Sequence, residues 1–240
     1  MNIEALPWKL QVPLTRLLSR NSWSLSQAGQ DFWVFGEVFN ERRGGYFLDV
    51  GAHDGLTISN TYLLERRYGW TGLCVEANPT TFQKLVRNRR CHCLNVCLDR
   101  DEGEVEFALR DVLGGIVDPA LDNRASAGMG APIIRVKTVP LQKLLKEHAA
   151  PQIIDYLSID IEGAEERVLG AFDFTSYRFN CLTIERPSPA LRGLLDRHGY
   201  TLIKEIHELD CFYVHRDFLG EYKRNLFAFG EKRHLAFRWR

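Results

Sequence analysis

Three acidic residues at or just beyond the ends of short apolar segments are candidates for acid–base or metal chemistry. Asp160 follows the apolar run 154–159, Glu162 stands two residues later, and Glu185 ends the apolar run 181–185. Carboxylates that converge from neighbouring strand ends either share a proton or hold a divalent cation. We therefore expect these residues to assist proton removal from a substrate. Asp160 and Glu185 are the predicted ligands if Mg²⁺ takes part.

A second group of residues surrounds the glycines of the stretch YFLDVGAHDGLTISN. Gly51 permits a tight turn, and Gly55 permits close approach of the backbone to a ligand. A dinucleotide fingerprint would need G-x-G-x-x-G, but His53 occupies the middle position. The pyrophosphate of a dinucleotide would also meet Asp49 and Asp54, which is electrostatically unfavourable. The pattern disfavours a nicotinamide-dependent reductase, which remains an alternative.

S-adenosylmethionine (SAM) suits this turn better, because it has no phosphate and its methionine part carries an ammonium and a sulfonium besides a carboxylate. Glu76 ends the next apolar run, at the spacing expected for a carboxylate that accepts hydrogen bonds from both ribose hydroxyls. The turn also places His53 beside the ligand, where it could position a group or transfer a proton. The turn and Glu76 together predict a nucleoside cofactor.

Short apolar runs alternate with helical patterns after residue 45, which is typical of a parallel sheet covered by helices on both faces. A helix is expected to begin at Ser24 or Ser26 and to continue to residue 39. Segments 104–109 and 133–139 resemble an additional strand pair, and the glycine-rich segment 113–130 is predicted to be a mobile loop over the site. The expected strands are 46–50, 72–76, 91–98, 154–159, 181–185 and a hairpin of 201–206 and 211–215; the expected helices are 57–67, 79–89, 141–147, 164–172 and 190–198.

Composition limits the class of protein. Lys and Arg total 31, as do Asp and Glu, so the balanced charge argues against a nucleic-acid partner. The arginines at 87, 89 and 90 are interpreted as a solvated face. No apolar run approaches the length of a membrane span, and no secretion signal is visible at the N-terminus, so we expect a cytoplasmic protein with six reduced cysteines. The sequence leaves open whether the chain forms a homo-oligomer.

The chain resembles the FkbM-type SAM-dependent methyltransferases. The resemblance rests on SQAGQD, FLDVGAHDGLTISNT, GLCVEANPTTFQKLVRNR, IDYLSIDIEGAEERVL and CLTIE, in that order, over roughly residues 26–185. It implies a Rossmann-like α/β fold with a mostly parallel seven-stranded sheet, helices on both faces and a C-terminal antiparallel hairpin. The cofactor-binding residues assigned from the turn and the resemblance together are Gln30, Asp49, Gly51, Ala52, His53, Asp54, Gly55, Ser59, Glu76, Ala77, Asp99 and Asp160.

The resemblance implies methyl transfer to a hydroxyl of a sugar, glycan or other small-molecule natural product. A non-catalytic protein that retains the SAM pocket is the second alternative. Residues 1–25 are interpreted as an N-terminal extension with an amphipathic segment at 10–18, residues 26–220 as the methyltransferase domain, and residues 221–240 as a C-terminal tail.

Overall fold

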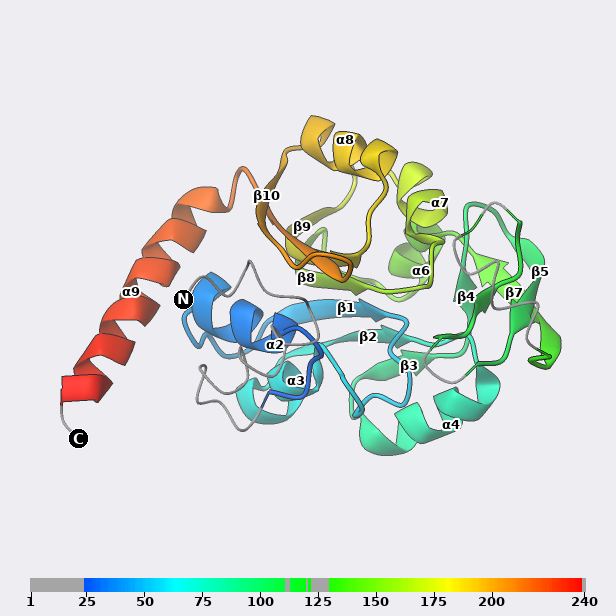
Figure 1. Cartoon of the computed structure of the whole chain (residues 1–240), viewed down its shortest axis with the longest axis horizontal. Coiled ribbons are helices and arrows are strands. Elements are labelled where there is room, and N and C mark those ends of the chain that lie inside the picture. The colour runs from blue at the N-terminus through cyan, green and yellow to red at the C-terminus, as the bar shows by residue number, and fades with distance from the viewer. Residues whose placement is uncertain (1–23, 111–112, 120, 122–129, 239–240) are drawn as a thin grey trace.

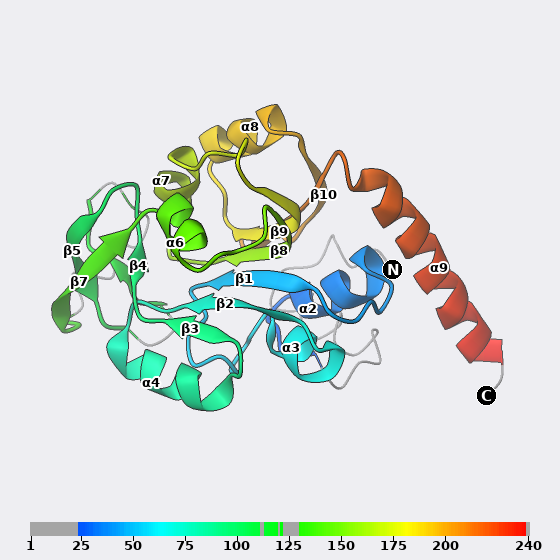
Figure 2. The ribbon, with the colours of Figure 1, turned by 180° about the vertical axis from the view of Figure 1, so that it is seen from behind.

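The computed structural model describes residues 24–110, 113–119, 121 and 130–238. Seven strands form the main sheet, in the order β10-β11-β9-β8-β1-β2-β3 (Figures 1 and 2). Strands β3, β2, β1, β8 and β9 are parallel to one another, whereas β11 runs antiparallel to β9 and to β10. The seven strands are β1 (Tyr46–Val50), β2 (Thr71–Val75), β3 (His92–Leu94), β8 (Ile153–Ile159), β9 (Arg178–Glu185), β10 (Tyr200–Glu205) and β11 (Asp210–His215).

Helices cover both faces of this sheet, as predicted (Figure 1). The strand order reverses direction at β1, because β2 pairs with one edge of β1 and β8 pairs with the other. Ligands of open α/β sheets bind at the carboxyl ends of the strands beside such a switch point. One face carries α6 (Leu141–Glu147), α7 (Glu165–Gly170) and α8 (Pro189–Arg197); the other carries α2 (Gln30–Phe32), η2 (Trp33–Val38), α3 (Tyr62–Tyr68) and α4 (Pro79–Asn88).

Alternation along each central strand builds two hydrophobic cores. Phe47 of β1 is buried in the core beneath η2 and α3, whereas Leu48 and Val50 are buried in the core beneath α6, α7 and α8. Successive side chains of a strand point to opposite faces, so a continuous apolar strand supplies both cores. The same alternation turns Asp49 toward the η2 and α3 side, where it is 4% exposed.

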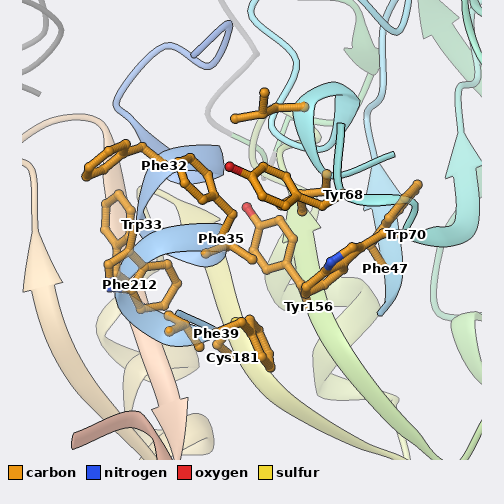
Figure 3. Close-up of a cluster of buried hydrophobic side chains, with 14 of the residues drawn as sticks. Phe32, Trp33, Phe35, Phe39, Phe47, Tyr68, Trp70, Tyr156, Cys181 and Phe212 are labelled. Carbon is orange, nitrogen blue, oxygen red and sulfur yellow. The ribbon is translucent and has the colours of Figure 1, made fainter. Parts of the chain in front are cut away.

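Aromatic side chains dominate the core under η2 (Figure 3). Phe35 stacks on Tyr68 with ring centroids 4.8 Å apart, and Trp33 meets Phe212 edge-to-face at 5.1 Å. Such pairs add about 0.5–1.5 kcal/mol each beyond their buried area. Phe39 meets Trp70 in the same way. These contacts join the segment before β1 to α3, to the residue before β2 and to β11.

The segment that we expected to form one helix up to residue 39 is shorter and differently wound. Only Gln30–Phe32 is α-helical, and Trp33–Val38 is a π-helix. Ser24 and Ser26 do not cap it; both hydroxyls donate to the buried carboxylate of Asp31, at 2.6 and 2.5 Å. The apolar spacing was nevertheless informative, because Phe32, Phe35, Val38 and Phe39 are all buried.

A second sheet lies beyond β3 and α4, with the order β4-β7-β5-β6 (Figure 1). Its strands are β4 (Cys97–Leu98), β5 (Gly103–Ala108), β6 (Gly115–Ile116) and β7 (Ile133–Val139). The predicted pairing of 104–109 with 133–139 is confirmed. The prediction of a single strand at 91–98 is wrong, because β3 belongs to the main sheet and β4 to the second sheet. Between them, the Asn95 side-chain amide donates to the carbonyls of Glu76 and Ala77 and interrupts the strand.

Part of the predicted mobile loop 113–130 is ordered in this second sheet. Gly115–Ile116 pairs with β5, and Ile116 is buried. Residues 120 and 122–129 lie outside the described part of the chain, as do residues 1–23 and therefore the amphipathic segment predicted at 10–18.

The helix predicted at 57–67 begins later, at Tyr62. Ile58 adopts φ 49°, which is strained for a β-branched residue and prevents an earlier start. The Ser59 hydroxyl accepts from the Tyr62 amide at 3.1 Å and stabilises the first turn.

The last helix, α9 (Leu219–Arg238), spans the predicted boundary between domain and tail at residue 220. Tyr222 and Phe229 are buried in the core under η2. A Cβ on Gly36 would lie 2.5 Å from Phe229 Cζ, so the glycine makes room for this ring. Among the described helices, none is long and apolar enough to cross a membrane.

Candidate functional site

The turn after β1 lies at the switch point and approaches the end of β8 closely. Gly51 has φ 82°, and a Cβ there would lie 1.9 Å from the backbone oxygen of Asp160. Gly55 has φ 73°, and a Cβ there would collide with Leu85 and Arg89 side chains. Packing therefore requires a glycine at both positions. The tight turn predicted at Gly51 is present, whereas the close approach at Gly55 is to α4, and Gly55 lines neither of the two pockets at this turn. The result is a turn held tightly between β8 and α4.

Two pockets lie at this turn and share Gly51 and Asp160. The first, which we call the apolar pocket, extends from the end of β2 to the second sheet. Its wall is mostly hydrocarbon, with Glu76 and Asp160 as the acidic residues. It is lined by Val50, Gly51, Val75, Glu76, Ala77, Val96, Cys97, Leu98, Phe107, Gly114, Ile116, Asp160, Ile161 and Ala164.

Glu76 stands at the mouth of the apolar pocket, as expected for a residue directly after β2. It is 8% exposed, and its carboxylate accepts from the His53 amide at 2.9 Å and the Asn78 amide at 2.8 Å. Burial raises its pKa, and these two bonds oppose that shift. A carboxylate has about four acceptor positions, so two remain for further donors.

The second pocket, which we call the polar pocket, lies on the other side of Gly51. Asn60 donates from Nδ2 to Ser158 Oγ at 2.9 Å, while its buried Oδ1 accepts no hydrogen bond from any described residue. A buried carbonyl oxygen without a donor is uncommon, and Asn60 Oδ1 is therefore free to accept from a donor in the pocket. The pocket is lined by Gln27, Gln30, Asp49, Gly51, Ala52, His53, Thr57, Ile58, Ser59, Asn60, Ser158 and Asp160.

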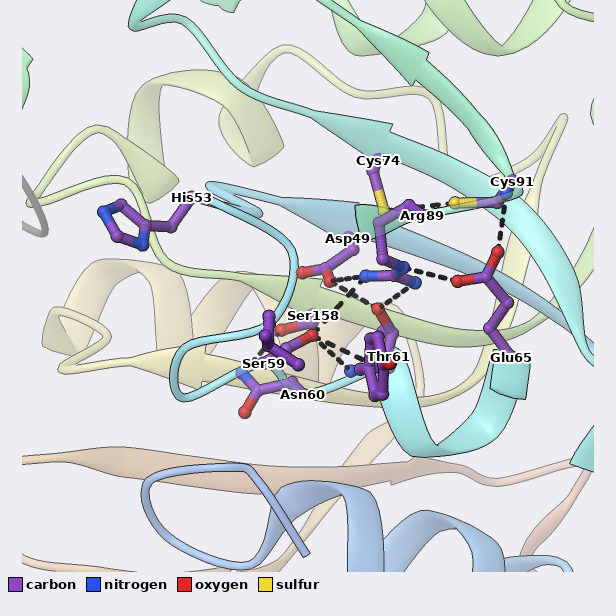
Figure 4. Close-up of polar contacts among 12 residues, drawn as sticks. Asp49, His53, Ser59, Asn60, Thr61, Glu65, Cys74, Arg89, Cys91 and Ser158 are labelled. Atoms are coloured by element: carbon purple, nitrogen blue, oxygen red, sulfur yellow. Dashed lines mark hydrogen bonds and ion pairs between the residues drawn. The ribbon is translucent and has the colours of Figure 1, made fainter. Parts of the chain in front are cut away.

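Asp49 lines the polar pocket but is also held by a buried ionic cluster behind it (Figure 4). The Thr61 hydroxyl donates to Asp49 Oδ2 at 2.5 Å, and Arg89 Nη1 lies 3.7 Å from the same atom. Arg89 donates from Nε to Glu65 at 2.5 Å and from Nη2 to Thr61 at 2.9 Å. The expectation that Arg89 belongs to a solvated face is wrong, because its side chain is 0% exposed. We call Asp49, Thr61, Glu65 and Arg89 the Arg89 cluster.

Asp160, Glu162 and Glu185 converge, as the strand ends predicted. One ligand atom of each lies within 4.8 Å of those of the other two. Burial and the nearby Asp210 raise the pKa of Asp160 to about 8, and burial and Asp160 raise the pKa of Glu185 to about 9. At least one of these two carboxyls therefore keeps its proton near neutrality. We call the three residues the carboxylate cluster.

The cluster has two neighbours that the sequence analysis missed. Arg186 Nη2 contacts Glu185 at 3.2 Å and Glu162 at 3.4 Å, and thus supplies positive charge. Asp210 pairs in register with Glu185 across β11 and β9, and burial raises its pKa to about 6. Arg186 directly follows Glu185 in TIERP and could have been noticed. Asp210 belongs to the hairpin, where no motif drew attention to it.

Gln30 and His53, two of the remaining predicted cofactor-binding residues, both line the polar pocket. Gln30 Nε2 donates to Asp210, and its Oε1 accepts from the Ala28 amide at 2.8 Å. His53 has φ 51°, and its ring points away from the Arg89 cluster (Figure 4).

Ala52, Ser59 and Ala77 lie in the walls of the two pockets. Asp54 instead closes its own turn, accepting from the Leu56 and Thr57 amides. Asp99 binds Arg167 through both oxygens, at 2.9 and 2.6 Å. Neither Asp54 nor Asp99 lines the two pockets, so their predicted contact with a cofactor has no support from their position.

Several solved structures match the chain at low sequence identity. The METTL16 MTase domain matches with TM-score 0.49 and 14% identity, over 88% of this chain and 82% of that one. Methyltransferase FkbM from Methylobacillus flagellatus KT matches with TM-score 0.45 and 12% identity over 88% of this chain, which spans only 56% of that protein. A TehB-like SAM-dependent methyltransferase from Corynebacterium glutamicum ATCC 13032 Kitasato matches with TM-score 0.39 and 11% identity, over 87% of this chain and 98% of that one. No curated protein sequence matches the chain.

A family profile identifies the chain more directly than these structures do. The profile described as Methyltransferase FkbM domain matches residues 49–202, more than half of the 240 residues. The matched segment begins near the end of β1 and contains Glu76 and the whole carboxylate cluster. The chain therefore belongs to the FkbM methyltransferase domain family and is a SAM-dependent methyltransferase.

Proposed function

We propose that this protein is an O-methyltransferase that methylates a hydroxyl of a small molecule or glycan. The proposal rests on the carboxylate cluster, whose Asp160 lines both pockets and in which at least one carboxyl keeps its proton near neutrality. When bound, SAM supplies an electrophilic methyl carbon on its sulfonium. A hydroxyl that receives this methyl group must lose its proton, and a carboxylate poised near neutral pH is suited to accept it.

The two pockets fit the two halves of SAM. We assign the apolar pocket to the adenine and Glu76 to the ribose hydroxyls, for which the carboxylate has acceptor positions left. We assign the polar pocket to the methionine part, with Asn60 Oδ1 as an acceptor for its ammonium group. Gly51 separates the two pockets, so the sulfonium would lie near Gly51 and Asp160, which both pockets share.

The base in this proposal is the Asp160–Glu185 pair. Whichever carboxylate is deprotonated accepts the hydroxyl proton, and the other keeps its own proton and lowers the repulsion between them. Arg186 contacts Glu185 and Glu162 and limits the negative charge that the pair must bear. Glu162 orients Arg186, and His53 is the rival base because it lines the polar pocket.

Mg²⁺ held by Asp160 and Glu185 is the alternative way to use these carboxylates. Arg186 already provides a cation at Glu162 and Glu185, and this contact favours the metal-free base. The two versions differ in their response to EDTA. Activity of the purified protein that survives EDTA supports the carboxylate base, whereas loss of activity that Mg²⁺ restores assigns the cluster to the metal.

The direct test is transfer of labelled methyl from SAM to panels of hydroxyl, amine, thiol and nucleic-acid acceptors. We expect label only on hydroxyl compounds, in line with the balanced charge of the chain, which provides little attraction for nucleic acid. Label on amines or RNA would refute the proposal. SAM binding without transfer to any acceptor would favour the non-catalytic alternative. We also propose a cytoplasmic location, in line with the six free cysteines.

A further inference from the structure

Three cysteines lie together on the edge of the main sheet, behind the Arg89 cluster. Cys74 of β2 is directly opposite Cys93 of β3 in the parallel register, and all three thiols of Cys74, Cys91 and Cys93 pack at the core under η2. Cys74 Sγ and Cys91 Sγ are 3.4 Å apart (Figure 4), whereas Cys93 Sγ contacts the Cys91 carbonyl oxygen at 3.6 Å. The closest thiol pair is thus Cys74 and Cys91.

The pair combines one accessible and one protected sulfur. Strand β3 is the outer strand of the sheet, and Cys91, just before it, is partly exposed. Cys74 is buried, and burial raises the pKa of its thiol. An oxidant from solution would therefore meet Cys91 before Cys74. The pKa of Cys91 is also raised, to about 11, although Arg89 favours its thiolate, whereas hydrogen bonds with Cys74 and Cys91 lower the pKa of Cys93 to about 4. The short distance between Cys74 Sγ and Cys91 Sγ, and not thiol acidity, therefore selects this pair.

Cys91 is also connected to the polar pocket through hydrogen bonds (Figure 4). Its amide donates to Glu65 Oε1 at 2.6 Å, and Arg89 donates to Glu65 Oε2 at 2.5 Å. Arg89 in turn lies beside Asp49, which lines the polar pocket. A displacement of Cys91 would therefore act on a chain of buried polar contacts that ends at the pocket wall.

We propose that Cys74 and Cys91 form a disulfide with a low-molecular-weight disulfide as oxidant, and that its closure weakens SAM binding. The Cys91 thiolate attacks glutathione disulfide, forming a mixed disulfide and releasing one glutathione thiolate. The Cys74 thiolate then attacks Cys91 Sγ and releases the second glutathione. In sum, two protein thiols are oxidised and one glutathione disulfide is reduced to two glutathione molecules. Closure shortens the sulfur separation from 3.4 Å to about 2.05 Å, which displaces Cys91 against Glu65.

The test treats the purified full chain with glutathione disulfide, counts free thiols by alkylation and mass spectrometry, and maps cross-linked peptides. We expect the loss of two thiols, a peptide that joins Cys74 to Cys91, and reversal by dithiothreitol. Calorimetry with SAM should show a Kd that rises about fivefold or more on oxidation and returns on reduction. Neither measurement needs an acceptor, so the result is independent of whether the protein methylates hydroxyls.

Matched variants separate this pair from its neighbour. Cys91→Ser should abolish the cross-link, and its SAM affinity should not respond to the oxidant. Cys93→Ser, in the same segment and also partly exposed, should keep both responses. The proposal is overturned if only a mixed disulfide forms, or if the cross-link joins Cys93. A Cys74–Cys91 bond that leaves the Kd for SAM unchanged would overturn the connection to the pocket.

Discussion

The Arg89 cluster and the carboxylate cluster both hold buried acidic residues near the carboxyl edge of the sheet, but they balance charge differently. Asp49 and Glu65 share one fully buried guanidinium, and Asp49 also accepts from the Thr61 hydroxyl. Burial raises the pKa of Asp49, while Arg89 and Thr61 oppose that shift. At Asp160, by contrast, the neighbouring charges of Asp210 and Glu162 add to the effect of burial.

This difference separates two uses of buried charge. Opposite charges in hydrogen-bond contact keep one protonation state and hold elements together, in this case β1, α3 and the end of α4. Like charges forced together instead bring a proton affinity into the neutral range, at a cost in stability. We infer that the Arg89 cluster supports the site and that the carboxylate cluster performs chemistry within it. The predictions below test that distinction.

The largest effect is expected on turnover when the carboxylate pair is neutralised. Asp160→Asn and Glu185→Gln preserve shape and remove charge, so each should lower kcat by about 10²- to 10⁴-fold. The Kd for SAM should change little, because the ribose and methionine contacts assigned above remain. Steady-state kinetics with the identified acceptor and calorimetry with SAM measure the two quantities. If both folded variants methylate at the wild-type rate, the pair has no role in proton removal.

Removal of the guanidinium should act on stability instead. Arg89→Met leaves Asp49 and Glu65 buried without their cation, so the free energy of unfolding should fall by about 3–5 kcal/mol. Arg87→Met, at an exposed position of α4, is the matched control and should change it by less than about 0.5 kcal/mol. Urea denaturation measures both variants. Equal stability of the two would show that burial of Arg89 contributes nothing.

Glu76 should affect cofactor affinity more than turnover. Glu76→Ala removes the carboxylate assigned to the ribose hydroxyls and should weaken SAM binding by about 1–3 kcal/mol. Glu104→Ala, on the exposed strand β5, is the control and should leave affinity unchanged. Calorimetry on both folded variants measures the Kd for SAM. An unchanged Kd in Glu76→Ala would refute the assignment of Glu76 to the ribose hydroxyls.

A smaller loss is expected at the other end of the cofactor. Asn60→Ala removes the acceptor assigned to the ammonium group and should raise the Kd for SAM by about fivefold, or about 1 kcal/mol. The same variant should bind S-adenosyl analogues that lack the amino group as well as wild type does. If wild-type protein binds SAM and such analogues equally, Asn60 does not recognise the ammonium group.

The smallest effect concerns stability as a function of pH. Because the folded-state pKa values of Asp160 and Glu185 are raised to about 8 and about 9, the folded protein binds more protons than the unfolded chain between about pH 4 and pH 9. The stability contributed by these groups is therefore present at low pH and is lost as pH rises through that window. Asp160→Asn has no carboxyl to ionise at this position, so it avoids part of the stability loss at high pH. Its free energy of unfolding at pH 8 should exceed that of the wild type by about 1 kcal/mol. Denaturation at pH 5 and pH 8 tests this; an equal difference between the variants at both values would contradict it.

Much of the sheet and of its edge followed from local sequence patterns. The apolar runs that became β1, β2, β8 and β9 carry Asp49, Glu76, Asp160 and Glu185 at or just beyond their ends, and parallel strands bring such ends to one edge. The glycines at 51 and 55 marked the turn, because only a residue without Cβ fits those approaches. Strand periodicity and turn chemistry are local properties, so a single sequence displays them.

Other features depended on contacts between segments distant in sequence. Arg89 looked like one of three solvated arginines until Asp49 and Glu65, 40 and 24 residues away, were placed around it. Asp210 lies beside Glu185 because β11 and β9 pair in that register. The break between β3 and β4 at Asn95 depends on hydrogen bonds to carbonyls just after β2. The sequence by itself determined which residues could bind a nucleoside and accept a proton. Tertiary structure alone decided which carboxylates were paired with a cation and which were forced together, because proton affinity depends on burial and on the charges that folding brings near.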